Sequence, residues 1–147
     1  MRTQIIIFAS IFWGAASAGQ PVTQSFLSKT KPLEQLVNEL DLASFRNSLG
    51  PRRDPQHRTL SSFGLKYKII DANTAVVENA EWTYTLRIIQ RGDINGDGIE
   101  DIELCFTDKA KHATYHAQSP LLVTKYAPTS FVIAVKFEVN GCENYAK

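Results

Sequence analysis

The feature that most constrains the fold of this chain is the spacing of apolar residues, which changes to a period of two from Phe63 onward. Three stretches show the alternation: FGLKYKII (63–70), WTYTLRII (82–89) and FVIAVKFEV (131–139). This period is typical of antiparallel strands with one face on a core. We expect the core-facing residues to be Leu65, Tyr67 and Ile69; Trp82, Tyr84, Leu86 and Ile88; and Phe131, Ile133, Val135, Phe137 and Val139. Segments 75–78, 101–106 and 121–126 complete about six strands.

The segment before these strands has helical spacing. In PLEQLVNELDLASFRNSLG (32–50), apolar residues recur at intervals of three and four. Pro32 favours a helix start and Gly50-Pro51 a stop, and Asp41 followed by Ser44 could restart a second short helix.

Helix first and strands after predict an α+β domain, with an N-terminal helix or two short helices packed on a roughly six-stranded antiparallel sheet. At 147 residues with 44% hydrophobic content, the chain is long enough for one domain with its own core. We expect this domain to span residues 32–147, after a flexible lead over residues 19–31.

Residues 1–18 have the pattern of a secretory signal peptide. Arg2 precedes an apolar run over residues 5–13, and small residues follow, ending at Ala18. Ser10 and Gly14 interrupt the apolar residues well before the roughly 20 that a membrane-spanning helix needs. We therefore expect cleavage after Ala18 and a secreted or periplasmic protein without a membrane span.

Charge and cysteine content limit the classes of partner. The chain has 16 basic and 15 acidic residues, and loss of Arg2 with the signal peptide leaves 15 of each. Nucleic acid is therefore not an expected partner, because binding it requires an excess of Lys and Arg. Cys105 and Cys142 are the two cysteines of a chain bound for an oxidising compartment, which favours one disulfide over two buried thiols.

The stretch RGDINGDGIEDIEL (91–104) has the spacing of a cation-binding loop. Calcium takes about six to eight oxygen ligands, and a chain that wraps it offers side chains at alternate positions, a glycine at position 6 and a carbonyl at position 7. Numbered from Asp93, Gly98 is at position 6 and Ile99 at position 7. The predicted ligands are Asp93, Asn95, Asp97 and Asp101 through their side chains and Ile99 through its carbonyl.

The loop departs from an EF-hand because Leu104 stands where a bidentate Glu is expected and a strand follows in place of a helix. The stretch GDINGDGIEDIEL resembles the calcium loop of FG-GAP and VCBS-type repeats, which occur in integrin-like propellers and secreted bacterial proteins. That resemblance covers about a dozen residues and implies the same five calcium ligands. This chain has one such loop and is too short for a propeller, so the loop would sit on a different scaffold.

Two other interpretations of this stretch remain. Asp, Asn and Gly favour turns without any metal, so the loop could be a plain β-turn. Residues 91–93 also spell Arg-Gly-Asp, a short tripeptide associated with cell adhesion, but a calcium ligand at Asp93 would face the ion and not an integrin.

Elsewhere the sequence offers weaker candidate sites. His112 and His116 lack a third zinc ligand, so we interpret DKAKHATYHAQS (108–119) as a solvated loop. It also supplies a candidate recognition surface, formed by Lys109, Lys111, His112, Tyr115 and His116. The basic loop over residues 52–58 is a second candidate for an anionic ligand, although such charge runs are usually solvated faces.

No pairing of a nucleophile with a base is evident, so we expect no catalytic residues. The predicted function is that of a small exported calcium-binding domain, bacterial and non-enzymatic, whose partner would be an unidentified protein or glycan. The alternative is a secreted hydrolase or inhibitor that uses loops 52–58 and 109–119 as a site. It requires those two loops to lie together beside the carboxylate loop.

Overall fold

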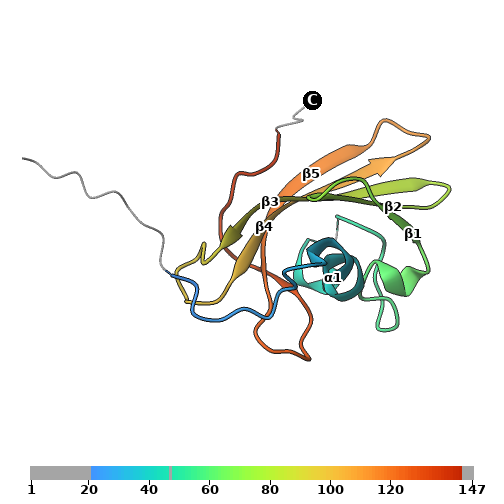
Figure 1. Ribbon diagram of the computed structural model, residues 1–147. Helices are drawn as coiled ribbons and strands as arrows, with labels where there is room; N and C mark the ends of the chain where they lie inside the picture. The colour runs from blue at the N-terminus through green and yellow to red at the C-terminus, as the bar shows by residue number, and fades with distance from the viewer. Residues whose placement is uncertain (1–20, 47, 144–147) are drawn as a thin grey trace, which may run out of the picture.

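Six antiparallel strands form one meandering sheet in the computed structural model, which describes residues 21–46 and 48–143 (Figure 1). The signal sequence predicted over residues 1–18 lies outside the described residues. The strands follow one another in chain order, so each pairs with its sequence neighbour. Their bounds are β1 Lys66–Ile69, β2 Thr74–Glu78, β3 Trp82–Gly92, β4 Asp101–Ala110, β5 His116–Thr124 and β6 Ile133–Val135. The predicted six-stranded antiparallel sheet is confirmed.

The helix α1, Pro32–Glu39, packs on one face of this sheet (Figure 1). Leu36 and Val37 on the helix and Leu86, Leu104 and Phe106 on the sheet are fully buried in a common core. Helix content is small, so the protein is mainly β, with one α-helix and two short 3-10 helices in the part described. With α1 at eight residues, no helix in that part is long enough to cross a membrane.

The helical segment is shorter than the predicted range 32–50. Leu40 leaves the helix in an extended conformation and forms a β-bridge with Val132, and the Asp41 amide donates to the Val132 carbonyl at 2.8 Å. The Asp41 side chain then caps a 3-10 helix over Leu42–Ser44, which is the predicted restart. Contact with Val132, 92 positions after Leu40, therefore ends α1. The bridge satisfies backbone N–H and C=O groups that would otherwise have been paired within a longer helix.

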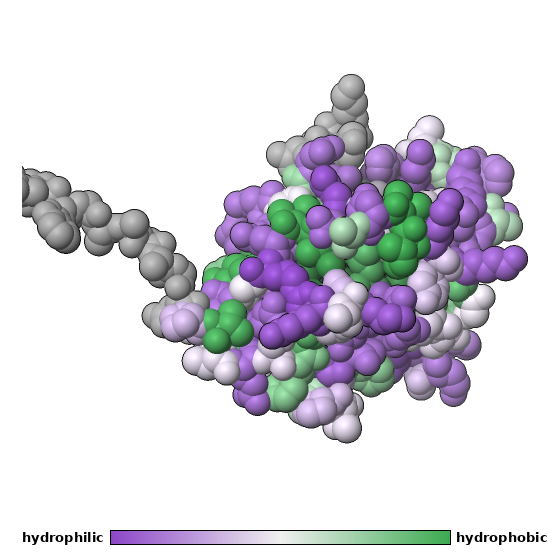
Figure 2. Space-filling view, in the orientation of Figure 1, coloured by the Kyte–Doolittle hydropathy of each residue, from purple (hydrophilic) through white to green (hydrophobic). Residues whose placement is uncertain are grey.

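Part of the predicted core pattern is wrong. All four residues of β1 are exposed, including Tyr67 at 43%. Phe131 and Phe137 are exposed as well, and Val132, which the predicted alternation turned away from the core, is fully buried. The cause is position: β1 is an edge strand, and the chain leaves β6 after three residues, so neither segment is covered as a central strand is. The face of the molecule seen in Figure 2 is mainly hydrophilic, with small hydrophobic patches between polar residues.

The segment 108–119 is not the predicted loop but a hairpin. β4 continues to Ala110, β5 begins at His116, and Lys109 pairs with His116 across the hairpin. Only residues 111–115 form the turn. Pairing between the strands extends the sheet through a polar sequence, because ladder hydrogen bonds need no apolar side chains.

Cys105 and Cys142 lie at disulfide-bonding distance, as the sequence predicted, with the two Sγ atoms 2.08 Å apart. The link holds the C-terminal tail against the middle of β4. Gly141 lies so close to the sheet that an added Cβ would stand 2.6 Å from Glu103 Oε1 and 2.7 Å from Ile89 Cγ1. A side chain at position 141 would therefore require the side chains of Glu103 and Ile89, or the tail itself, to move.

Candidate functional site

The carboxylate loop, residues 93–101, connects β3 to β4, and the last residues that pair between these strands are Gly92 and Asp101. Its short polar side chains shape the turn by accepting hydrogen bonds from its own backbone. Asp93 accepts from the amides of Gly96 at 2.8 Å and Gly98 at 2.9 Å, and Asp97 accepts from Ile99 at 2.8 Å. Gly96 and Gly98 have φ values of 80° and 86°, a left-handed backbone that glycine adopts without strain. The sequence DINGDGI therefore folds into a tight loop from local interactions.

Asp101 stands at the base of this loop and is 0% exposed. Its Oδ2 accepts from the amides of Ile94 at 3.0 Å and Asn95 at 3.2 Å, so the carboxyl group faces into the loop. Its Oδ1 is buried and has no hydrogen-bond partner among the described residues. Burial raises the pKa of Asp101; the amides of Asn95 and Ile94, together with the nearby Thr124 hydroxyl, which itself donates to the Glu100 carbonyl at 3.1 Å, oppose the rise only in part. A buried carboxylate with one unsatisfied oxygen is costly unless a positive group approaches it.

Tyr126 stands beside the loop, with its hydroxyl 3.5 Å from Asp97 Oδ2, a long hydrogen bond. Burial and then the charges of Asp97 and Asp101 raise the pKa of this tyrosine. No cationic side chain pairs with Asp93, Asp97 or Asp101 among the described residues. The hydrogen-bond partners of these three carboxylates are therefore backbone amides, the Asn95 side chain and the Tyr126 hydroxyl.

The donor atoms of the loop have the chemistry that calcium requires, namely carboxylate, amide and carbonyl oxygens. As they stand, no three His, Cys, Asp or Glu side chains in the described part of the chain converge in a group that could hold a metal. Asp93, Asp97 and Asp101, the three predicted ligands of those types, therefore do not converge in this structure, while Asn95 and the Ile99 carbonyl are of other types. A carboxylate has about four lone-pair sites, so Asp93 and Asp97 keep acceptor capacity beyond the amide bonds they accept.

An N-terminal strap, residues 22–28, lies against the carboxylate loop (Figure 1, blue beside gold). Gln24 forms a parallel β-bridge with Ile99, and the Gly98 carbonyl accepts from the amides of Thr23 and Gln24 and from the Thr23 hydroxyl. Glu100 accepts a hydrogen bond from the Ser25 hydroxyl and is paired with Arg91 at 3.0 Å. Burial opposes ionisation of Glu100, but the bonds from Ser25 and Arg91 outweigh it and lower its pKa.

These strap contacts join residues 75 positions apart and have no signal in the sequence. Thr23, Gln24, Ser25 and Tyr126 were therefore missed as neighbours of the site. Arg91, the first residue of the Arg-Gly-Asp tripeptide, donates to Glu100 and to the Ser28 carbonyl at 2.8 Å. It serves to hold the strap, and this does not favour a role in adhesion.

The candidate recognition surface lies at the other end of β4. Lys111 pairs with Glu78 at 2.7 Å, and the Tyr115 hydroxyl donates to the Ser48 carbonyl at 3.1 Å. His112 is in the turn, while Lys109 and His116 face each other across β4 and β5. β4 has ten residues, so about 30 Å of strand separates this turn from the carboxylate loop. This turn therefore lies far from the carboxylate loop, whereas the segment just before the basic loop contacts the same end of β4, since the Gly50 amide donates to Asp108 at 2.9 Å. The hydrolase or inhibitor alternative stays a prediction.

The basic loop over residues 52–58 is largely occupied with internal contacts. Arg53 donates to the Phe45 carbonyl at 2.7 Å, and His57 lies 3.0 Å from Asp54. Arg58 pairs with the buried Asp41 and stacks over the Phe131 ring at 4.8 Å. Much of the charge in this loop is therefore used in contacts that stabilise the fold.

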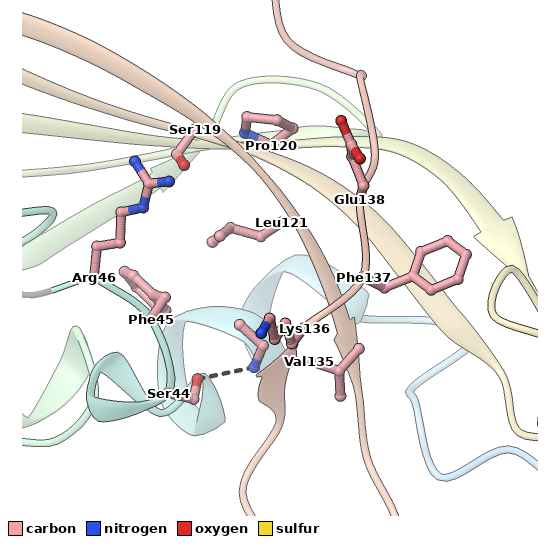
Figure 3. A pocket seen from close by; sticks show the side chains of 11 residues that line it. Ser44, Phe45, Arg46, Ser119, Pro120, Leu121, Val135, Lys136, Phe137 and Glu138 are labelled. Atoms are coloured by element: carbon pink, nitrogen blue, oxygen red, sulfur yellow. Dashed lines mark hydrogen bonds between the residues drawn. The ribbon is translucent and has the colours of Figure 1, made fainter.

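A groove of about 670 Å³ lies elsewhere, between Phe45, β5 and the segment after β6 (Figure 3). Arg46 extends toward Ser119 at one side, and the Phe137 ring points away from the groove. The hydrogen bond from the Ala134 amide to Ser44 Oγ, 2.8 Å, closes its lower end. None of the predicted ligands lines it.

Comparison with protein-family models, with curated proteins and with solved structures finds no match to this chain.

Proposed function

We propose that this protein is a small exported domain that binds one calcium ion in the carboxylate loop, and that the ion has a structural or binding role and not a catalytic one. The ligands would be the side chains of Asp93, Asn95, Asp97 and Asp101 and the carbonyl of Ile99. The observation that carries the proposal is the Asp101 carboxylate, which is buried at the base of the loop with one oxygen unpartnered.

Electrostatics supports a cation at this position. Asp93, Asp97 and Asp101 lie within nine residues, so their charges repel each other unless a positive group lies between them. Neutral amides satisfy some of their lone pairs but do not cancel the charge. A divalent cation would do both, because it offers charge and open coordination positions to Asp101 Oδ1 and to the remaining lone pairs of Asp93 and Asp97.

The proposed consequence of binding is a rigid turn at one end of the β3–β4 hairpin. Sites of this kind outside the cell bind calcium with dissociation constants of about 10⁻⁴ to 10⁻³ M. At a hundredfold excess of calcium over that constant, binding would add about 2.7 kcal/mol to the free energy of unfolding. The domain would present this turn to a partner. That partner would be a protein or a glycan, and the site does not specify which one.

Isothermal titration calorimetry of the full chain with calcium tests the proposal. The wild type should bind one ion, and Asp101→Asn should weaken binding at least tenfold, because asparagine keeps the shape and one acceptor oxygen but removes the charge. Asp108→Asn is the matched control: Asp108 is also a buried aspartate of β4 with one unpartnered oxygen, but it accepts from Gly50 at the far end of the strand. The absence of saturable binding by the wild type at about 5 mM calcium, above the expected constants, would refute the proposal.

A further inference from the structure

The N-terminal strap is hydrogen-bonded to the peptide group that contains the one predicted backbone ligand, the Ile99 carbonyl. From that contact we infer that Gln24 is a positioning residue: its carbonyl holds the Ile99–Glu100 peptide group, so that docking of the strap and binding of calcium strengthen each other. The inference rests on the proposed calcium site and adds a regulatory element that lies outside the loop.

The geometry of one peptide group provides the link. The Ile99 carbonyl is the proposed ligand, and the amide of the same peptide group, that of Glu100, donates to the Gln24 carbonyl at 2.8 Å. A trans peptide is planar and rigid, so its carbonyl and amide point in opposite directions. Fixing the amide toward the strap therefore fixes the carbonyl toward the interior of the loop. A cation on the carbonyl would in turn polarise the amide and strengthen its bond to Gln24.

The neighbouring peptide group reinforces this link. The Gly98 carbonyl accepts three hydrogen bonds from the strap, including one of 2.6 Å from the Thr23 hydroxyl. The amide of that group, which belongs to Ile99, donates to Asp97 Oδ1 at 2.8 Å. Two consecutive peptide groups thus have the strap on one side and a predicted ligand on the other.

The two halves of the strap are held differently. Thr23 and Gln24 make their hydrogen bonds to the loop, and Ser25 bonds to Glu100 next to it. Further along the chain, Leu27 is buried in the core and the Ser28 amide donates to Gln35 of α1 at 2.6 Å. Calcium should therefore affect the docking of residues 23–25 and leave residues 27 and 28 in place.

Thermodynamic linkage makes the coupling measurable from both sides. Suppose that the protein with the strap docked on the carboxylate loop binds calcium more tightly, by some factor, than the protein with the strap undocked. Calcium must then favour docking of the strap by the same factor. Coupling factors of about 5 to 150 are typical between linked sites, and we expect about tenfold here. A strap that only covers the surface would show no such reciprocity.

The first arm of the test is amide hydrogen exchange on the full chain, resolved to single residues, with calcium and with chelator. Exchange at Thr23, Gln24 and Glu100 should slow by about tenfold in calcium, within the range typical of linked sites. The Ser28 amide should exchange equally in both buffers and serves as the internal control.

The second arm is calorimetric titration of the double variant Thr23→Ala/Ser25→Ala, which weakens docking without touching a predicted ligand. Its calcium dissociation constant should rise several-fold, but by no more than the factor by which calcium slows exchange in the wild type. Thr30→Ala removes a hydroxyl from an exposed residue just beyond the strap and should leave the constant unchanged.

The outcomes separate the two proposals. Tight calcium binding by the wild type, with equal strap exchange in both buffers and an unchanged constant in the double variant, would overturn the coupling and leave the calcium site intact. Failure of the wild type to bind calcium in the titration would overturn both.

Discussion

Replacing Asp97 by alanine should abolish most of the calcium-dependent rise in melting temperature. Asp97 contributes a carboxylate at position 5 of the carboxylate loop, and its removal takes away a predicted ligand and one of three negative charges. At a hundredfold excess of calcium, the wild type should gain about 2.7 kcal/mol. For a domain of this length, 1 kcal/mol shifts the melting temperature by about 3 to 5 °C, so the wild-type shift should be about 10 °C.

The calcium-free protein should respond much less to this substitution. Asp97 accepts hydrogen bonds from the Ile99 amide at 2.8 Å and from Asn95 at 3.1 Å, and its side chain is exposed. Losing these bonds costs about 1 kcal/mol, and the relief of repulsion from Asp93 and Asp101 offsets part of that cost. The melting temperature in chelator should therefore change by no more than about 4 °C.

Differential scanning calorimetry in calcium and in chelator measures both quantities. Asp71→Ala is the matched control, because Asp71 is an exposed residue of the β1–β2 turn that accepts a comparable bond from the Asn73 amide at 2.8 Å. It should lower both melting temperatures equally. His112→Ala should also leave the calcium response intact. Superimposable wild-type curves in the two buffers would show that the loop is only a turn and that the reasoning fails.

Three further predictions follow from the rest of the fold. Cys142→Ser, which opens a link to Cys105 across a separation of 37 residues, should lower the free energy of unfolding by about 3 to 4 kcal/mol in urea titrations; two free thiols in the unreduced wild type would contradict it. Gly141→Ala should cost about 1 to 3 kcal/mol, because the added methyl would stand 2.6 Å from Glu103 Oε1, and an unchanged urea midpoint would show that the tail shifts freely. Burial raises the pKa of Asp108 in the folded state, so its ionised form destabilises the folded protein above that pKa, and this destabilisation disappears below the pKa of the unfolded state. The wild type should therefore gain stability relative to Asp108→Asn as the pH falls from 7 toward about 4. A stability difference between the two proteins that does not change with pH would argue against this prediction.

The parts of the fold that short-range patterns specify were predictable. Alternating side chains along 82–89 placed Tyr84, Leu86 and Ile88 in the core, and they are buried there. Glycines at 96 and 98 among Asp and Asn predicted a tight loop, and both adopt the left-handed conformation that the turn needs. The cysteine pair and the number of strands were predictable for similar reasons. Turn residues and the period of apolar residues depend only on neighbouring positions, and pairing two cysteines in a chain that has only two requires no knowledge of distances.

Features that depend on which distant segments meet were decided by the tertiary structure. The same alternation that buries β3 leaves Tyr67 of β1 exposed, because only the sheet order reveals an edge strand. The sequence also determined that Asp101 follows the loop, but only the packed structure buries its carboxylate and leaves one oxygen unpartnered. Likewise, residues 23–25 are polar and carry no periodic signal, yet they bond to the loop 75 positions later, since backbone hydrogen bonds across such distances depend on the fold as a whole and not on local preference.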